Sequence, residues 1–137
     1  MAFRVKSIDH VEIFVRDIEA SADWYADVLG LARVMAWDPE PLMIGRGGTK
    51  LALFKAPRGS RPLGARGHKA LARRVSIHRV AFLTDRRGFD TAQKRLRDRD
   101  IAFRGPIDHG ATRSIYFHDL DGILLEITHP VRGGRPR

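Results

Sequence analysis

The sequence predicts an α+β fold made of two copies of one strand-helix-strand-strand-strand unit, and two observations support this prediction. In each half of the 137 residues, a β-rich run contains one histidine, and an aspartate follows that histidine seven residues later. After each aspartate comes a helical pattern of apolar residues, and then three short strand patterns. We therefore expect residues 1–137 to form a single domain with these parts in order: module 1 at about 7–55, a basic linker at 56–75 and module 2 at about 76–130.

Module 1 is expected to open with a strand over residues 7–15. Asp17 can cap the following helix, because an aspartate oxygen accepts hydrogen bonds from the first free N–H groups of a helix. Apolar residues then recur at helical spacing up to Leu29, and Gly30 is placed to end the helix. Turn residues divide the rest of the module into three short strands, at about 32–36, 43–45 and 50–54.

Module 2 repeats this order. A strand is expected over residues 76–83, and Asp85 is placed to cap a helix that carries Phe89, Ala92 and Leu96 on one face. The remaining strands are expected at about 101–104, 113–118 and 123–129, and the tail at 131–137 is expected to fray.

The linker is strongly basic and contains no acidic residue. It holds no aromatic side chain that could stack on bases, so we expect no nucleic-acid partner, and we expect a solvated segment that attracts an anionic substrate or partner. The basic run begins one residue before the linker and consists of Lys55, Arg58, Arg61, Arg66, Lys69, Arg73 and Arg74.

The composition bounds the class of protein. A chain of this length can bury a core and a small-molecule cavity, and its net charge is +9. The absence of cysteine excludes disulfides and thiolate metal sites. No apolar run reaches the length of a membrane span, and the first residues lack the apolar core of a signal peptide. We therefore expect a cytoplasmic protein with no membrane partner.

Glu126 is the most informative single residue. It stands between Leu125 and Ile127 in a run that reads as a strand buried on both faces. An unpaired buried carboxylate costs several kcal/mol, so Glu126 needs a cation, a proton or exposure at a strand end. A bound metal ion would satisfy it best.

Two histidines open their modules in the same way. By period-two alternation, His10 shares a face with Glu12 and Phe14, and His78 shares a face with Val80 and Phe82. The same rule groups Tyr116 with Ser114 and His118, and Glu126 with Leu124 and Thr128. Taken alone, a strand histidine is more often a core or strand-end residue. Two imidazoles and one carboxylate from different strands, however, match the facial triad of a divalent metal site.

On these residues the chain resembles the vicinal oxygen chelate superfamily, also called the glyoxalase, bleomycin-resistance and extradiol dioxygenase superfamily. The resemblance implies paired βαβββ modules that form a cupped mixed β-sheet around one divalent metal, with His10, His78 and Glu126 as ligands. The resemblance rests on these residues: Ile8-Asp-His10, Asp17-Ile, Trp24-Tyr25, Leu29-Gly-Leu31, His78, Asp119-Leu-Asp-Gly122 and Glu126.

The family's glyoxalases use a fourth protein ligand, and the corresponding position here is Ala52. This difference favours three-ligand members, such as extradiol dioxygenases and fosfomycin-inactivating transferases. The C-terminal stretch is most similar to the extradiol signature, with Leu120 where that signature has proline. The resemblance then implies that Tyr116 and His109 orient substrate and oxygen. The acid/base histidine of the extradiol enzymes has no clear counterpart here, and His68 in the linker is the nearest candidate.

These expectations describe a metal-dependent, extradiol-dioxygenase-like enzyme that acts on a small oxygen-chelating substrate, catechol-like or anionic. Fe(II) or Mn(II) is the metal expected first, with Zn, Ni or Mg as possibilities. One alternative is a glyoxalase- or fosfomycin-resistance-type lyase, isomerase or transferase. The other is a non-enzymatic, bleomycin-type ligand-sequestering protein. A homodimer is expected, because short sheets leave edge strands that can pair.

Overall fold

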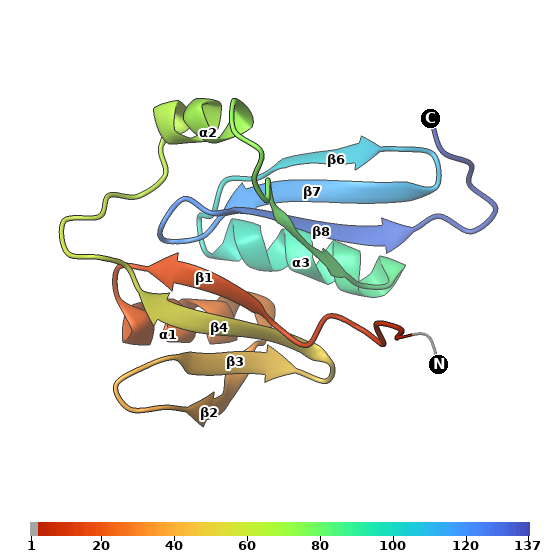
Figure 1. Cartoon of the computed structure of the whole chain (residues 1–137). Coiled ribbons are helices and arrows are strands. Elements are labelled where there is room, and N and C mark those ends of the chain that lie inside the picture. Colours follow the sequence, from red (N-terminus) through yellow and green to blue (C-terminus); the bar gives the residue numbers. More distant parts are fainter. Residues whose placement is uncertain (1–2) are drawn as a thin grey trace. The chain divides into compact units, whose positions relative to one another are not determined.

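The computed structural model describes residues 3–137, and the chain divides into two compact units. Unit 1 ends at Ser60, and unit 2 runs over Arg61–Arg137. Each unit has its own four-stranded mixed sheet (Figure 1).

Unit 1 contains one helix and one sheet, in which the strand order is β1-β4-β3-β2. The first strand runs parallel to β4, and the other neighbouring strands are antiparallel. The elements are β1 (Val11–Val15), α1 (Ile18–Leu29), β2 (Ala32–Ala36), β3 (Leu42–Arg46) and β4 (Thr49–Lys55).

Local sequence signals set the ends of α1. Asp17 Oδ1 accepts a hydrogen bond from Ala20 N at 3.0 Å, as expected of an N-cap. Gly30 ends the helix in the left-handed conformation, with φ +69°. The buried face of α1, which includes Tyr25 and Val28, lies against β2, β3 and β4.

Unit 2 repeats the same order after an additional helix. Its sheet order is β5-β8-β7-β6, again with one parallel pair, β5 with β8. The α+β class and the repeated strand-helix-strand-strand-strand order are therefore confirmed. The elements are α2 (Ala65–Ala72), β5 (Val80–Leu83), α3 (Arg86–Asp98), β6 (Arg104–Asp108), β7 (Thr112–His118) and β8 (Leu124–Pro130).

Three parts of unit 2 differ from the sequence prediction. The linker contains the helix α2, which was not predicted and none of whose residues is fully buried. The strand predicted at 76–83 begins only at Val80. The strand predicted at 101–104 lies at 104–108 instead, with a register irregularity between Arg104 and Ile107, where Pro106 supplies no N–H to the sheet.

The C-terminal tail is the fourth difference, because it does not fray. Arg137 N donates a hydrogen bond to His109 O at 3.1 Å, and its guanidinium donates to Asp108 Oδ2 at 2.9 Å. The tail therefore lies along the loop between β6 and β7.

The linker contacts the turn between β7 and β8. Leu63 N donates a hydrogen bond to Asp121 O at 2.7 Å, and His68 Nε2 lies 2.8 Å from Gly122 O. Gly122 has φ +80°, and a Cβ atom there would lie 2.0 Å from Leu63 O. This close approach of two backbones requires glycine.

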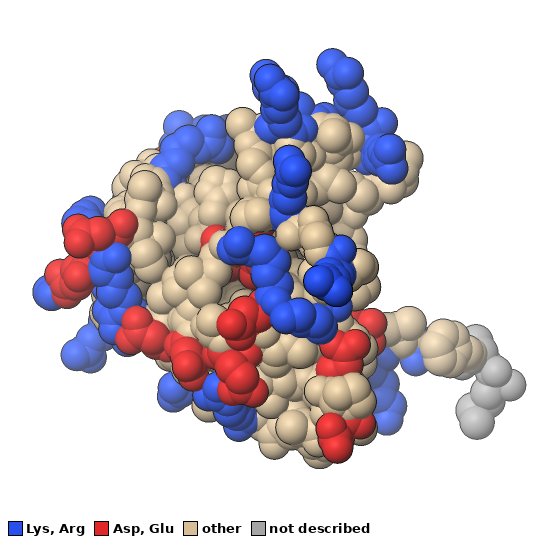
Figure 2. All heavy atoms as spheres, turned by 90° about the vertical axis from the view of Figure 1, so that its left-hand side faces the viewer, with Lys and Arg blue, Asp and Glu red and all other residues tan. Residues whose placement is uncertain are grey.

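Lys and Arg side chains gather in the upper part of the face shown in Figure 2, where few Asp or Glu side chains appear. The helix α2 contains the exposed residues Arg66 and Lys69, and the exposed residues Arg73 and Arg74 follow it directly. Within residues 3–137, no helix combines the length and the apolar character needed to cross a membrane.

We predict that Gly122→Ala destabilises the protein more than Gly133→Ala. Both glycines have positive φ, +80° and +72°, but only at Gly122 would an added Cβ atom lie within 4 Å of another part of the chain. Gly133→Ala, the control, should therefore lower the free energy of unfolding only by the cost of a left-handed backbone at alanine, about 1–2 kcal/mol. Gly122→Ala should lose at least about 1 kcal/mol more, because it also displaces the linker. Urea unfolding followed by circular dichroism measures both, and equal losses would contradict the proposed backbone clash.

Candidate active site

One face of the sheet in unit 2 holds Glu126 and Tyr116, two of the residues that the sequence singled out. The strand register places Ala81, Glu126, Tyr116 and Arg104 opposite one another across β5, β8, β7 and β6. Directly opposed residues share a face, so these four side chains lie on one side of the sheet.

Burial along β8 alternates. Leu125, Ile127 and His129 are buried, and α3 contacts β8, with the rings of Phe89 and His129 centred 4.6 Å apart. Residues on the Glu126 face are only partly buried. The expectation of a strand buried on both faces is therefore wrong, since only the helix-facing side is fully covered.

Glu126 is nevertheless poorly neutralised. Its side chain is 16% exposed, and Arg79 Nη1 lies 3.8 Å from Glu126 Oε2. This separation satisfies an ion pair but is too long for a hydrogen bond. The carboxylate thus has a cation nearby that does not occupy its lone pairs.

Tyr116 lies at the centre of this face. Its hydroxyl is 2.8 Å from His109 Nε2, so the two residues expected to be catalytic are in direct contact. The guanidinium carbons of Arg79 and Arg104 lie 4.8 and 5.1 Å from the centroid of its ring. These are cation–π distances. Neither arginine was expected in the site, because only strand register shows that Arg104 faces Tyr116.

A cavity of about 700 Å³ opens beside Tyr116, entirely within unit 2. Its ionisable side chains are histidines, arginines and one tyrosine, with no carboxylate among them. The lining residues are Ala65, His68, His78, Arg79, Ala102, Phe103, Arg104, Tyr116, His118 and Leu124.

His78 reaches this cavity by a route that alternation does not predict. The register pairs Val80 with Leu125 and Phe82 with Ile127, so these two residues lie on the face opposite Glu126. His78 was expected on their face. It lines the same cavity as Tyr116 instead, because the regular strand begins only at Val80. The expected face was therefore wrong.

His68 and His118 form a second pair in the cavity wall, with ring centroids 5.3 Å apart. Burial lowers the pKa of His118 below its usual value, and the nearby charge of His68 lowers it further. His68 Nε2 lies 2.8 Å from Gly122 O, which only accepts hydrogen bonds. Nε2 of His68 is therefore the donor in this contact.

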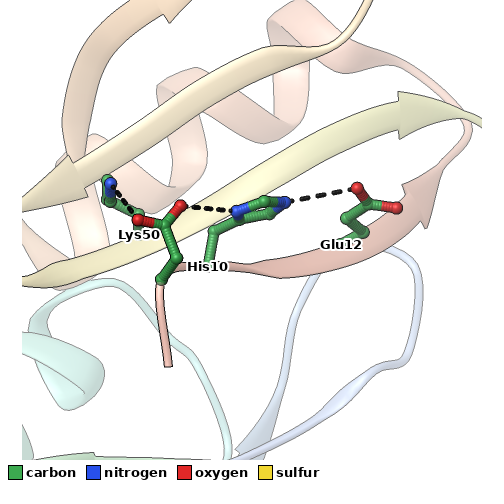
Figure 3. Close-up of polar contacts among 4 residues, drawn as sticks. His10, Glu12 and Lys50 are labelled. Atoms are coloured by element: carbon green, nitrogen blue, oxygen red, sulfur yellow. Dashed lines mark hydrogen bonds and ion pairs between the residues drawn. The ribbon is translucent and has the colours of Figure 1, made fainter. Parts of the chain in front are cut away.

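His10 lies in unit 1, just before β1, within a chain of polar contacts (Figure 3). Its Nδ1 is 2.8 Å from Asp9 Oδ2, and its Nε2 is 3.2 Å from Glu12 Oε1. Lys50 Nζ donates to Asp9 Oδ1 at 3.3 Å. The hydrogen bonds to Asp9 and then Glu12 raise the pKa of His10 above its usual value. Glu12 thus pairs with His10, which supports their expected common face.

Within either unit, the described residues contain no group of three His, Asp or Glu side chains placed to hold a metal ion. His10 belongs to unit 1, while His78 and Glu126 belong to unit 2. The chemistry of these donors still suits a divalent first-row metal. His78 makes no hydrogen bond with another described residue, and Asp9 holds His10 by Nδ1, as carboxylates commonly hold ligating histidines.

Comparison with known proteins gives a consistent result. The family model described as the Glyoxalase/Bleomycin resistance protein/Dioxygenase superfamily matches residues 7–127. Biphenyl-2,3-diol 1,2-dioxygenase 3 from Rhodococcus globerulus is 32% identical over 122 residues, which cover 86% of this chain and 60% of that protein. The chain therefore spans about three-fifths of the length of this relative.

Two solved structures share the fold. A glyoxalase/dioxygenase from Nostoc punctiforme aligns with a TM-score of 0.72 and 25% identity, covering 92% of each chain. The fosfomycin resistance protein FosX from Listeria monocytogenes aligns with a TM-score of 0.70 and 15% identity, covering 93% of this chain and 96% of that one. Since the family model covers most of the sequence and the repeated modules match these folds, the chain belongs to the Glyoxalase/Bleomycin resistance protein/Dioxygenase superfamily.

Proposed function

We propose that this protein is a metal-dependent enzyme that acts on a small oxygen-chelating substrate, with extradiol-dioxygenase-like chemistry. The observation that carries the proposal is the Tyr116–His109 contact of 2.8 Å on the sheet face that also holds Glu126. The cavity beside Tyr116 offers room for a small molecule. The similarity to a diol dioxygenase supports the same reaction class.

The proposed metal ligands are His10, His78 and Glu126, with Fe(II) or Mn(II) as the preferred ion. When bound, such an ion supplies a Lewis acid that lowers the pKa of a coordinated hydroxyl group. To act as a ligand, His10 gives up its Nε2 contact with Glu12 and keeps its Nδ1 contact with Asp9. Because the pKa of His10 is raised, protons compete with the metal ion for Nε2.

Tyr116 and His109 are proposed to act as a unit. His109 Nε2 and the Tyr116 hydroxyl oxygen lie 2.8 Å apart. In this proposal His109 Nε2–H donates to the phenol oxygen, which leaves the phenol proton for an oxygen atom of the substrate. Arg79 and Arg104 restrict the phenol to one orientation, since both guanidinium groups lie on its ring. Tyr116 is itself only 8% exposed.

We predict that His10→Ala, His78→Ala and Glu126→Ala each remove most of the bound metal, because each deletes one of three ligands. Metal content is measured by elemental analysis of protein purified without added metal, and circular dichroism checks the fold. His118→Ala is the matched control, since His118 lines the cavity but is not a proposed ligand. Stoichiometric metal in all three variants would reject the triad. Iron in the unmodified protein would favour oxygenation, whereas zinc, nickel or magnesium would favour lyase or transferase chemistry.

We predict that Tyr116→Phe keeps normal metal content and lowers the rate on catechol-type substrates by about a hundredfold or more, as expected when a preorganised donor is removed. The double variant with His109→Gln should lose little more than Tyr116→Phe alone, because the two residues act together. Tyr25→Phe, which removes the other phenol of the chain, is the control. Unchanged turnover in Tyr116→Phe would leave Tyr116 as a core aromatic residue.

We also propose a homodimer. Each sheet has two edge strands, β1 and β2 in unit 1, and β5 and β6 in unit 2, and exposed edges favour pairing between chains. Light scattering should give twice the chain mass of 15.5 kDa. A mass of one chain at every concentration would reject the dimer.

A further inference from the structure

We infer that the cavity of unit 2 selects small molecules that carry an anionic group on an apolar, planar body, with Arg104 as the principal anion-binding residue and Arg79 as the second. This inference rests on the proposed function in taking the cavity as the substrate site. It adds the substrate class and the residues that determine it.

The charge of the cavity wall is the first argument. The lining contains two arginines and three histidines but no aspartate or glutamate. Arginine stays protonated at every physiological pH. A concave surface with one sign of charge concentrates ligands of the opposite sign, and it disfavours cationic ones.

Arg104 provides the second argument. The residue is exposed, and the one interaction of its side chain with another described residue is the contact of 5.1 Å with the ring of Tyr116. Stacking restricts the guanidinium group to one place, while its N–H donors remain available. A planar fork of this kind matches the two oxygens of a carboxylate or phosphonate.

Arg79 offers a weaker version of the same arrangement. It stacks on Tyr116 at 4.8 Å, and its contact with Glu126 is 3.8 Å long, so its donors are not consumed by a hydrogen bond to that carboxylate. A metal ion on Glu126 would compete for the carboxylate and free Arg79 further. We therefore expect Arg79 to contribute less than Arg104 in metal-free protein.

The rest of the wall fits an apolar body. Phe103, Leu124, Ala65 and Ala102 line the cavity together with the ring of Tyr116. The volume of about 700 Å³ is in the range of small-molecule sites. Apolar walls with two fixed cations favour an aromatic acid over either a neutral aromatic or a bare anion.

The test compares phenylacetate with phenylacetamide, which has nearly the same shape and no charge. Both are titrated calorimetrically into the full chain, after chelation and again with metal restored. We expect phenylacetate to bind about tenfold tighter or more, as charge-assisted hydrogen bonds imply. Arg104→Gln should remove most of this preference, Arg79→Gln a smaller part, and Arg104→Lys should retain part of it, since lysine keeps the charge but not the fork.

Arg113→Gln is the matched control, because Arg113 is an exposed arginine of β7 that does not line the cavity. Equal binding of the two probes, no binding of either, or the same loss in Arg104→Gln and Arg113→Gln would overturn the inference. Circular dichroism confirms that the variants are folded. The measurement on chelated protein does not depend on the metal triad. If the triad variants keep their metal, the triad assignment is wrong, but the preference for phenylacetate should remain. If that preference is absent while the metal content is normal, only the present inference is rejected.

Discussion

The carboxylate of Asp119 closes the turn between β7 and β8, and the site in unit 2 depends on that turn. Its Oδ1 accepts hydrogen bonds from Asp121 N at 2.8 Å and Ile123 N at 2.9 Å. The turn fixes the register in which Tyr116 faces Glu126. A slip of one residue would send every side chain of one strand to the other face of the sheet, so this register decides which residues meet at the cavity.

The same turn also fixes the linker. Because Gly122 has no side chain, Leu63 can lie against it, and His68 reaches the Gly122 carbonyl oxygen from α2. The ring of His68 then lies beside His118 in the cavity wall. A basic segment that buries none of its helical residues is thus held at the turn by the backbone of Leu63 and the side chain of His68. The turn at Asp119–Gly122 therefore fixes the strand register and also holds His68 in the cavity wall.

The two units distribute charge differently around their histidines. In unit 1, Asp9 and Glu12 surround His10 and favour its protonated form. In unit 2, the cavity has arginines and histidines without a carboxylate in its wall, and burial disfavours the protonated form of His118. The proposed metal ligand His10 and the proposed anion-binding residue Arg104 therefore lie in surroundings of opposite charge, in different units.

The sequence by itself determined the features that depend on neighbours along the chain. Asp17 and Gly30 mark the two ends of α1, because capping involves only nearby N–H and C=O groups. Alternation correctly grouped Tyr116 with His118, because β7 is a regular strand. Alternation failed at His78, where the strand has not yet begun, and the short helix α2 within the linker was not predicted. The stacking of Arg79 and Arg104 on Tyr116 was decided by tertiary structure alone, since these residues meet only through the pairing of β5, β8, β7 and β6. Cross-strand register brings together residues that are far apart in the chain, and no local pattern contains that information.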